Sequence, residues 1–284
     1  MKQSKDLSIV NCIATSLLAV FLSIPVHEFI HFITFYIYGD KCEYFAATSV
    51  NYLELIDYRS LSTFHRVMAT GGSASIVNAI IGLILLVILF KAKLGSMTRL
   101  FLTQLMGAHL TEGFGYFMID GIFGAGDWGN VFSYFTDAPE FVSVLRIVLS
   151  VVGIGGTVCL FFILNHMSYY FIEDPEDKGQ RMGVAIRLHL VMLITGVITH
   201  FATWAQNPGV KSGATSFAFS CLTVLMWIPF FWGFMFTGVM KVKRPKESRF
   251  LYKLPEKPNY IFLAAGIILI LIDIFVFGPG IYTK

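Results

Sequence analysis

The sequence predicts an all-α polytopic membrane protein with about seven transmembrane helices. Of its 284 residues, 56% are hydrophobic and only 14% are charged, and the mean hydropathy is +0.70. This composition contains more apolar surface than one soluble domain of this length could bury. Apolar segments long enough to cross about 30 Å of hydrocarbon recur along the whole chain. We therefore expect a single membrane domain without an appended soluble module.

Seven apolar segments carry this prediction. In chain order they cover approximately residues 8–38, 67–90, 98–119, 141–165, 183–204, 215–240 and 260–278. Between the first two, the stretch from Tyr44 to Leu53 is rich in aromatic and β-branched residues, which favours a short β-hairpin. The free edge of such a hairpin could hold an extended peptide. A connecting loop on the membrane surface explains the same residues.

The basic residues of the loops predict an orientation. The loop covering residues 120–140 contains no Lys or Arg, whereas Lys2 and Lys5 precede the first segment. The largest basic cluster falls between the sixth and seventh segments: Lys241, Lys243, Arg244, Lys246, Arg249, Lys253 and Lys257. Because Lys and Arg concentrate in cytoplasmic loops, seven spans place the amino terminus inside and the carboxyl terminus outside. The net charge of +3 follows from this topology, and no aromatic-interleaved basic patch indicates a nucleic-acid partner.

The first apolar segment contains the run His27-Glu28-Phe29-Ile30-His31. On a helix, residues four apart share one face, so both histidines can reach one metal ion while Glu28 lies beside it. This spacing is typical of zinc hydrolases. Exposing these polar side chains to lipid would cost several kcal/mol of free energy. We therefore expect them to face a protein interior or a water-filled cavity.

A catalytic zinc site usually has three protein ligands and one open position, so a third ligand must come from elsewhere. The carboxyl ends of the first and third segments lie on the same side, because two crossings separate them. Asp120 and Asp127 follow the third segment, and we expect one of them to be the ligand. The flexible glycine-rich loop around Asp127 slightly favours that residue, because it could turn back toward the metal.

Other polar residues lie within the apolar segments. His109 and Glu112, three residues apart on the third segment, are candidates for orienting a metal ligand or for an accessory metal pair. Small residues at positions 107, 111 and 115 predict close packing of the third segment against the first. In the second half, His189, His200 and Asp273 are most simply explained by a structural His–Asp contact.

The order of these motifs resembles that of the site-2 protease family of intramembrane zinc metalloproteases. The His-Glu run is followed by Ala74-Ser75-Ile76-Val77-Asn78 and then by Asp120-Gly121 or Gly126-Asp127, and the resemblance covers about the first half of the chain. Two departures mark a distant member: Ile30 replaces a frequent Gly, and Ala74-Ser75 replace the usual Gly-Pro.

The resemblance implies a zinc endopeptidase that cuts peptide bonds within or next to transmembrane segments of a membrane-anchored protein or peptide. Zinc would activate a water molecule, Glu28 would act as general base, and Asn78 would contact the substrate near the scissile peptide. An Asn in a membrane helix is also often only an interhelical hydrogen-bond partner. Family members commonly place the site toward the cytosol, in contrast to the orientation that the loop charges predict.

On this basis, residues 1–140 are expected to form the catalytic core with the zinc site, and residues 141–284 additional helices packed on it. We expect a multi-pass protein of a prokaryotic cell membrane, embedded in the lipid bilayer; the sequence does not specify its oligomeric state. Two other functions are compatible with the sequence. One is a catalytically inactive relative that binds membrane proteins, and the other is a transporter with a polar pathway formed by His189, His200 and Asp273.

Overall fold

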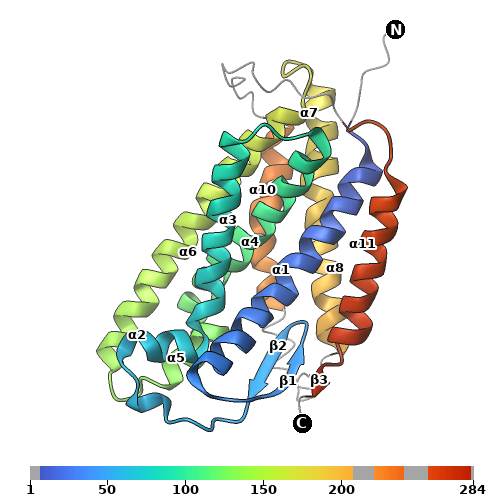
Figure 1. Ribbon diagram of the computed structural model, residues 1–284. Helices are drawn as coiled ribbons and strands as arrows, with labels where there is room; N and C mark the ends of the chain where they lie inside the picture. Colours follow the sequence, from blue (N-terminus) through green and yellow to red (C-terminus); the bar gives the residue numbers. More distant parts are fainter. Residues whose placement is uncertain (1–6, 207–220, 240–254, 283–284) are drawn as a thin grey trace.

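The computed structural model describes residues 7–206, 221–239 and 255–282. It is a bundle of helices with a small β-sheet at one end (Figure 1). The α-helices are α1 (Ile9–Tyr38), α2 (Thr63–Val67), α3 (Ser73–Lys91), α4 (Ser96–Phe123), α5 (Gly126–Ser133), α6 (Pro139–Ser168), α7 (Lys178–Ala185), α8 (Val191–Gln206), α10 (Ile228–Thr237) and α11 (Tyr260–Ile272). The predicted all-α fold is confirmed.

Short 3-10 and π-helical segments join or extend several of these helices. The π-helical segments are η2 (Met68–Gly72), η4 (Ile186–Leu190) and η8 (Asp273–Phe277). The 3-10 segments are η1 (Tyr58–Ser60), η3 (Tyr169–Phe171) and η6 (Val224–Trp227). Because η2 and η4 are continuous with their neighbours, α2 and α3 form one rod that is bent at Gly71, and α7 and α8 form another continuous rod.

Within the described residues, five helices are long and apolar enough to cross a membrane. They are Ile9–Tyr38, Thr63–Lys91, Pro139–Phe171, Lys178–Gln206 and Tyr260–Phe277. The prediction of seven spans is therefore confirmed only in part. The sixth predicted segment is represented by a shorter apolar helix, Cys221–Thr237. The first residues of the predicted segment, 215–220, lie outside the described part of the chain.

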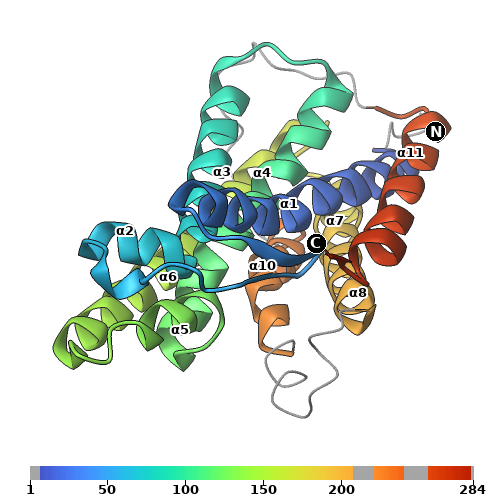
Figure 2. The same ribbon diagram turned by 60° about the horizontal axis from the view of Figure 1, so that its bottom comes forward.

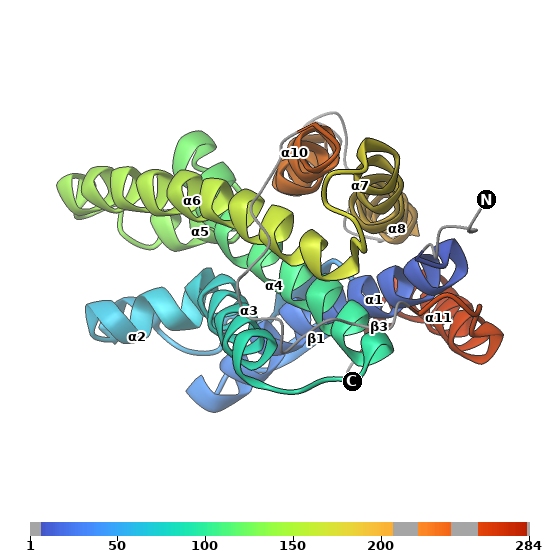
Figure 3. The same cartoon turned by 90° about the horizontal axis from the view of Figure 1, so that it is seen from above.

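The third predicted segment forms α4, which has the length of a span but is not among these five helices. Its lower hydropathy has a structural explanation, because α4 packs against α1, α3 and α6 (Figure 3). Polar side chains such as Gln104 and Thr103 are buried there, and the Gln104 amide donates to Ser16 Oγ of α1 at 2.9 Å. A helix covered by protein does not need an apolar surface toward lipid.

The small-residue face of α4 packs against a different partner from the one predicted. A Cβ atom at Gly107 would lie 2.7 Å from the Phe230 ring, and one at Gly115 would lie 2.7 Å from Met226. Both partners belong to η6 and α10, not to α1. The predicted packing of this helix against the first helix is confirmed, but it does not use Gly107 and Gly115, where the absence of side chains admits large residues of the sixth segment.

The predicted hairpin is present, as β1 (Cys42–Ala46) paired antiparallel with β2 (Ser49–Tyr52). A third strand, β3 (Ile281–Tyr282), pairs with β1, so the strand order is β2-β1-β3. Figure 2 turns this end of the molecule forward and shows the strands beside the end of α1. The far end of the described chain therefore completes the sheet that follows the first helix.

The two halves of the chain share one hydrophobic core. Its buried residues come from α1, α4, α6, α10 and α11 alike, and α11 packs along α1. Helix α1 begins at one end of the bundle and β3 lies at the other (Figure 1), as an odd number of passes requires. The amino-terminal lysines and the basic residues 241–253 lie outside the described part of the chain, so the predicted orientation stays a prediction.

Candidate metal centre

The carboxyl-terminal half of α1 turns the His-Glu motif toward the protein interior. His27, Glu28 and His31 are 1%, 6% and 5% exposed, whereas Phe29 between them is 49% exposed. The expectation that the motif avoids lipid is confirmed. The His27 ring stacks on Tyr116 of α4, with the ring centroids 4.5 Å apart, and this contact limits rotation of the imidazole.

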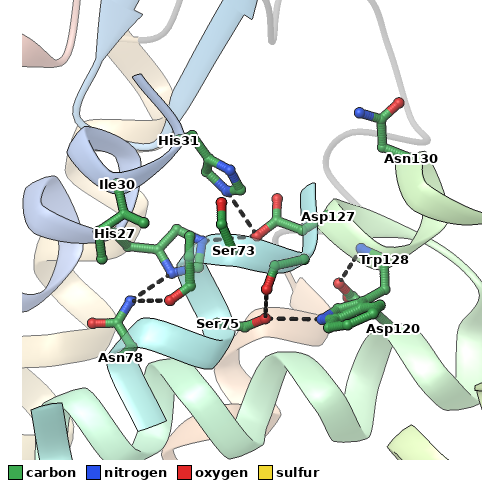
Figure 4. A network of polar contacts seen from close by, with 12 residues as sticks. His27, Ile30, His31, Ser73, Ser75, Asn78, Asp120, Asp127, Trp128 and Asn130 are labelled. Carbon is green, nitrogen blue, oxygen red and sulfur yellow. Dashed lines mark hydrogen bonds and ion pairs between the residues drawn. The ribbon is translucent and has the colours of Figure 1, made fainter. Parts of the chain in front are cut away.

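Asp127, in the first turn of α5, lies beside both histidines (Figure 4). Its Oδ2 atom is 2.8 Å from His27 Nε2 and 3.1 Å from His31 Nε2. One ligand atom from each of the three residues lies within 4.8 Å of the others. Burial by itself raises the pKa of Asp127, but the charges of His31 and His27 and hydrogen bonds from both rings lower it below its ordinary value. These contacts therefore favour the ionised form of the carboxylate.

Asp120 has a different position and role. It is fully buried near the end of α4, and its Oδ2 atom accepts the backbone N–H of Trp128 at 3.1 Å. Because the residue preceding α5, Ala125, has no side chain that can cap the helix, Asp120 satisfies one of the free N–H groups at its start. Of the two aspartates that the sequence left open, the structure brings Asp127 to the histidines, and Asp120 holds the helix that carries it.

The segment carrying Asp127 is an anchored helix and not the flexible loop that its glycines suggested. The Trp128 indole N–H donates to Ser75 Oγ at 2.9 Å, and the ring packs in a buried cluster with Ala79 and Phe117. Asn130 donates to Thr70 O at 2.6 Å. These contacts tie α5 to the bent rod formed by α2 and α3, so Asp127 has a defined position.

A bend in that rod makes room for Asp127. Gly71 adopts φ 151° within η2, a conformation that L side chains rarely adopt. A Cβ atom on Gly71 would lie only 2.4 Å from the backbone oxygen of Asp127. No motif discussed above includes this glycine, although the Gly-Gly pair at positions 71 and 72 is a sequence signal of close backbone approach.

A cavity of about 160 Å³ opens beside the three residues. Glu28, His31, Tyr116 and Asp127 line one side of it, and the hairpin residues Thr48, Ser49, Val50 and Tyr52 line another. Glu28 therefore faces a space in which water and a peptide group could lie. Ile30, which departs from the family pattern, does not line this cavity.

Asn78 lies behind His27 and not in the cavity. Its side chain is fully buried, and its Nδ2 atom is 2.9 Å from His27 Nδ1. Its Oδ1 atom is 2.6 Å from Nδ1 of His109 on α4. The structure thus connects His109 to His27 through Asn78, as expected for a group that orients a ligand. The substrate-binding role of Asn78 stays a prediction that this placement does not favour.

Buried carboxyl groups gather around the centre. Glu112 lies 5% exposed on α4, close enough for its charge to act on Glu28. No Lys or Arg of the described chain forms an ion pair with either group or with Asp127. Several buried carboxyl groups without a basic partner need protons or a cation to offset their charges.

The donor set fits zinc. Two imidazole nitrogens and one carboxylate oxygen are ligands that zinc accepts at about 2.0–2.2 Å, which separates ligand atoms of a tetrahedral site by about 3.3 Å. The 2.8 and 3.1 Å contacts of Asp127 are near that value, so a small opening of the cluster accommodates the ion. Three protein ligands leave a fourth position, as catalytic zinc sites require.

The polar residues of the second half do not form the predicted His–Asp contact. His189 Nε2 is 2.6 Å from Ser168 Oγ, and His200 Nε2 is 2.7 Å from Thr223 Oγ1. Asp273 has no hydrogen-bond partner among the described residues. Each histidine contacts a hydroxyl group on a neighbouring helix through Nε2, and Nδ1 of His189 has no hydrogen-bond partner among the described residues. Neither histidine bonds to Asp273, so this expectation is wrong.

Comparison of the chain with protein family models, curated proteins and solved structures found no match. The resemblance to site-2 proteases therefore rests on the motifs, and the geometry above is the basis for a functional assignment.

Proposed function

We propose that this protein is an intramembrane zinc endopeptidase that hydrolyses peptide bonds within or next to transmembrane segments of membrane-anchored proteins. The observation that carries the proposal is the convergence of His27, His31 and Asp127 on one point, with Glu28 lining the adjacent cavity. These residues come from α1 and α5, which are about a hundred positions apart in the chain.

The chemistry assigns a task to each group. Zinc, when bound, lowers the pKa of a coordinated water and polarises a carbonyl group. Glu28 takes one proton from the attacking water and delivers it to the amide nitrogen as the C–N bond breaks. The water oxygen forms the new bond to the carbonyl carbon, so the products are a carboxylic acid and an amine. His27, His31 and Asp127 hold the metal, and α5 positions Asp127.

The hairpin favours a peptide as substrate. Residues Ser49, Val50 and Tyr52 of β2 line the cavity, and β3 occupies the opposite edge of β1. β2 is thus an edge strand of the sheet, and its residues line the cavity. Main-chain groups at such an edge can hold an extended peptide, which a transmembrane helix becomes only after local unwinding.

Zinc content tests the metal site without a known substrate. We expect about one zinc per chain by elemental analysis of the detergent-purified protein, and its loss in His31→Ala and Asp127→Ala, because each removes a ligand. Asp120→Asn is the matched control: it keeps an oxygen for the Trp128 N–H and should retain the metal. Loss of zinc from Asp120→Asn together with retention in Asp127→Ala would contradict the assignment.

Proteolysis is tested separately with Glu28→Gln, which keeps the size of the side chain and removes its basicity. Amino termini of membrane proteins are labelled and identified by mass spectrometry in cells producing either wild type or Glu28→Gln. New termini within transmembrane segments are expected only with the wild type. Identical termini in both samples, from a variant that still holds zinc, would favour the inactive, membrane-protein-binding alternative.

A further inference from the structure

Asn78 occupies the space between two histidines on different helices. The amide lies on α3, with His27 of α1 at 2.9 Å on one side and His109 of α4 at 2.6 Å on the other. Its Nδ2 atom also donates to Ala74 O at 3.1 Å. All three side chains are buried, and neither Asn78 nor His109 lines the cavity. The chain of contacts therefore reaches the centre from the protein interior.

The two nitrogens of His27 face different groups. Nε2 points to Asp127 and so to the proposed metal position, whereas Nδ1 meets the Asn78 amide. In metal sites the second ring nitrogen of a ligand histidine normally contacts a polar group, which sets the tautomer and the ring orientation. Among the described residues, Asn78 is the side chain that meets His27 at this nitrogen.

An amide is suited to this position. Its oxygen accepts and its nitrogen donates, and the two ends differ little in size. Metal binding at Nε2 leaves the proton on His27 Nδ1, so the amide then presents its oxygen to His27 and its nitrogen to His109, and it gives up the bond from Nδ2 to Ala74 O. His109 can likewise accept or donate through Nδ1, and it contacts whichever end faces it. With Tyr116 stacked on the face of the His27 ring, the imidazole is restrained both at its edge and at its face.

We propose that Asn78 is a positioning residue that orients His27 for metal binding, and that His109 holds the far end of the Asn78 amide. This inference rests on the proposed metal centre and assigns Asn78 to the metal ligand instead of the substrate. It makes the interaction of α1, α3 and α4 part of the metal site, although the metal ligands themselves come from α1 and α5.

The test is the affinity for zinc, measured by competition with a chelator in detergent. Asn78→Ala is expected to weaken binding by about 10–100-fold, the usual effect of losing a group that orients a ligand. Asn165→Ala is the matched control, because Asn165 is also a buried helix amide, bonded to Thr237 Oγ1 at 2.9 Å. It should bind zinc as the wild type does. Asn78→Asp retains an acceptor for His27 and should restore most of the affinity.

A second readout is the visible spectrum of the cobalt-substituted protein, which reports the ligand geometry. Asn78→Ala should alter it, and Asn165→Ala should not. If Asn78→Ala does not fold, His109→Leu and His109→Gln replace it: Leu should weaken zinc binding, and Gln, which can still bond to Asn78, should preserve it.

The outcomes separate the two proposals. Wild-type affinity in Asn78→Ala, or in His109→Leu where that variant replaces it, would overturn the positioning role and leave the metal centre intact. Equal losses in Asn78→Ala and Asn165→Ala would show a general effect of removing a buried amide and would also overturn it. Absence of zinc from the wild type would remove the metal centre itself, and this inference with it.

Discussion

Gly71, in the bend between α2 and α3, lies against the backbone of Asp127. It has no side chain, and the space that a Cβ atom would need is taken by the Asp127 carbonyl. Its φ of 151° adds a conformational requirement to this steric one. The position of Asp127, a proposed metal ligand, thus depends on a residue that has no side chain with which to bind a metal.

Gly71→Ala is therefore expected to weaken zinc binding and to destabilise the protein. The unfavourable backbone conformation alone costs about 1–3 kcal/mol, and the clash must displace Asp127 or unbend the rod. Zinc content and the thermal unfolding midpoint in detergent measure the two effects. Gly155→Ala is the control, since a Cβ atom there meets nothing within 4 Å and alanine favours helix. Full zinc occupancy in Gly71→Ala would show that the site does not need this approach.

Helix α5 is held by contacts that come from several other elements. Asp120 of α4 caps its start, Ser75 of α3 accepts the Trp128 indole N–H, and Tyr52 of β2 accepts from Asn130 at 3.1 Å. An eight-residue helix has little stability of its own in water. The position of α5 is thus a property of its neighbours, and so is that of Asp127.

Ser75→Ala should destabilise the protein by about 1–3 kcal/mol, because it leaves a buried indole N–H without an acceptor. Thermal unfolding of purified protein measures the change, and Ser143→Ala, at an exposed position on α6, should have little effect. In a Trp128→Phe background the donor is absent, so Ser75→Ala should cost less. An undiminished cost in that background would show that the hydrogen bond does not account for it.

At the scale of the whole molecule, α5, which carries Asp127, and the loop between α3 and α4 lie at opposite ends of the bundle (Figure 1). Lys91 ends α3, and Lys93 lies in the loop that follows. If Lys and Arg mark the cytoplasmic side, the centre and the hairpin face outward. This differs from the cytosolic placement common among the proteins that the motifs resemble.

Cysteine labelling decides between the two orientations. In a background with Cys12, Cys42, Cys159 and Cys221 replaced by Ser, Lys41→Cys beside the hairpin and Lys93→Cys in the distal loop each present one exposed thiol. We expect a membrane-impermeant maleimide added to intact cells to label Lys41→Cys, and to label Lys93→Cys only after permeabilisation. The reverse pattern would place the centre on the cytoplasmic side. Labelling of both from one side would contradict the arrangement of the bundle.

Much of the fold and part of the site could be read from the sequence. Segment hydropathy predicted the helices, and the spacing of His27, Glu28 and His31 placed them on one buried face, because both signals are local periodicities of an α-helix. Aromatic and β-branched residues after the first helix predicted the hairpin. The candidate metal residues came from residue type and spacing alone, down to a choice between two aspartates.

What the tertiary structure decided concerns contacts between residues far apart in the chain. It placed Asp127 beside the histidines and Asp120 at the start of α5. Which aspartate reaches the histidines depends on how α5 packs against α3 and α4. It turned the small-residue face of α4 toward Phe230 and Met226, and it brought β3 to β1 across most of the chain. Local pattern determines which face of a helix is buried, whereas the partner of that face depends on the shapes of all the helices packed together.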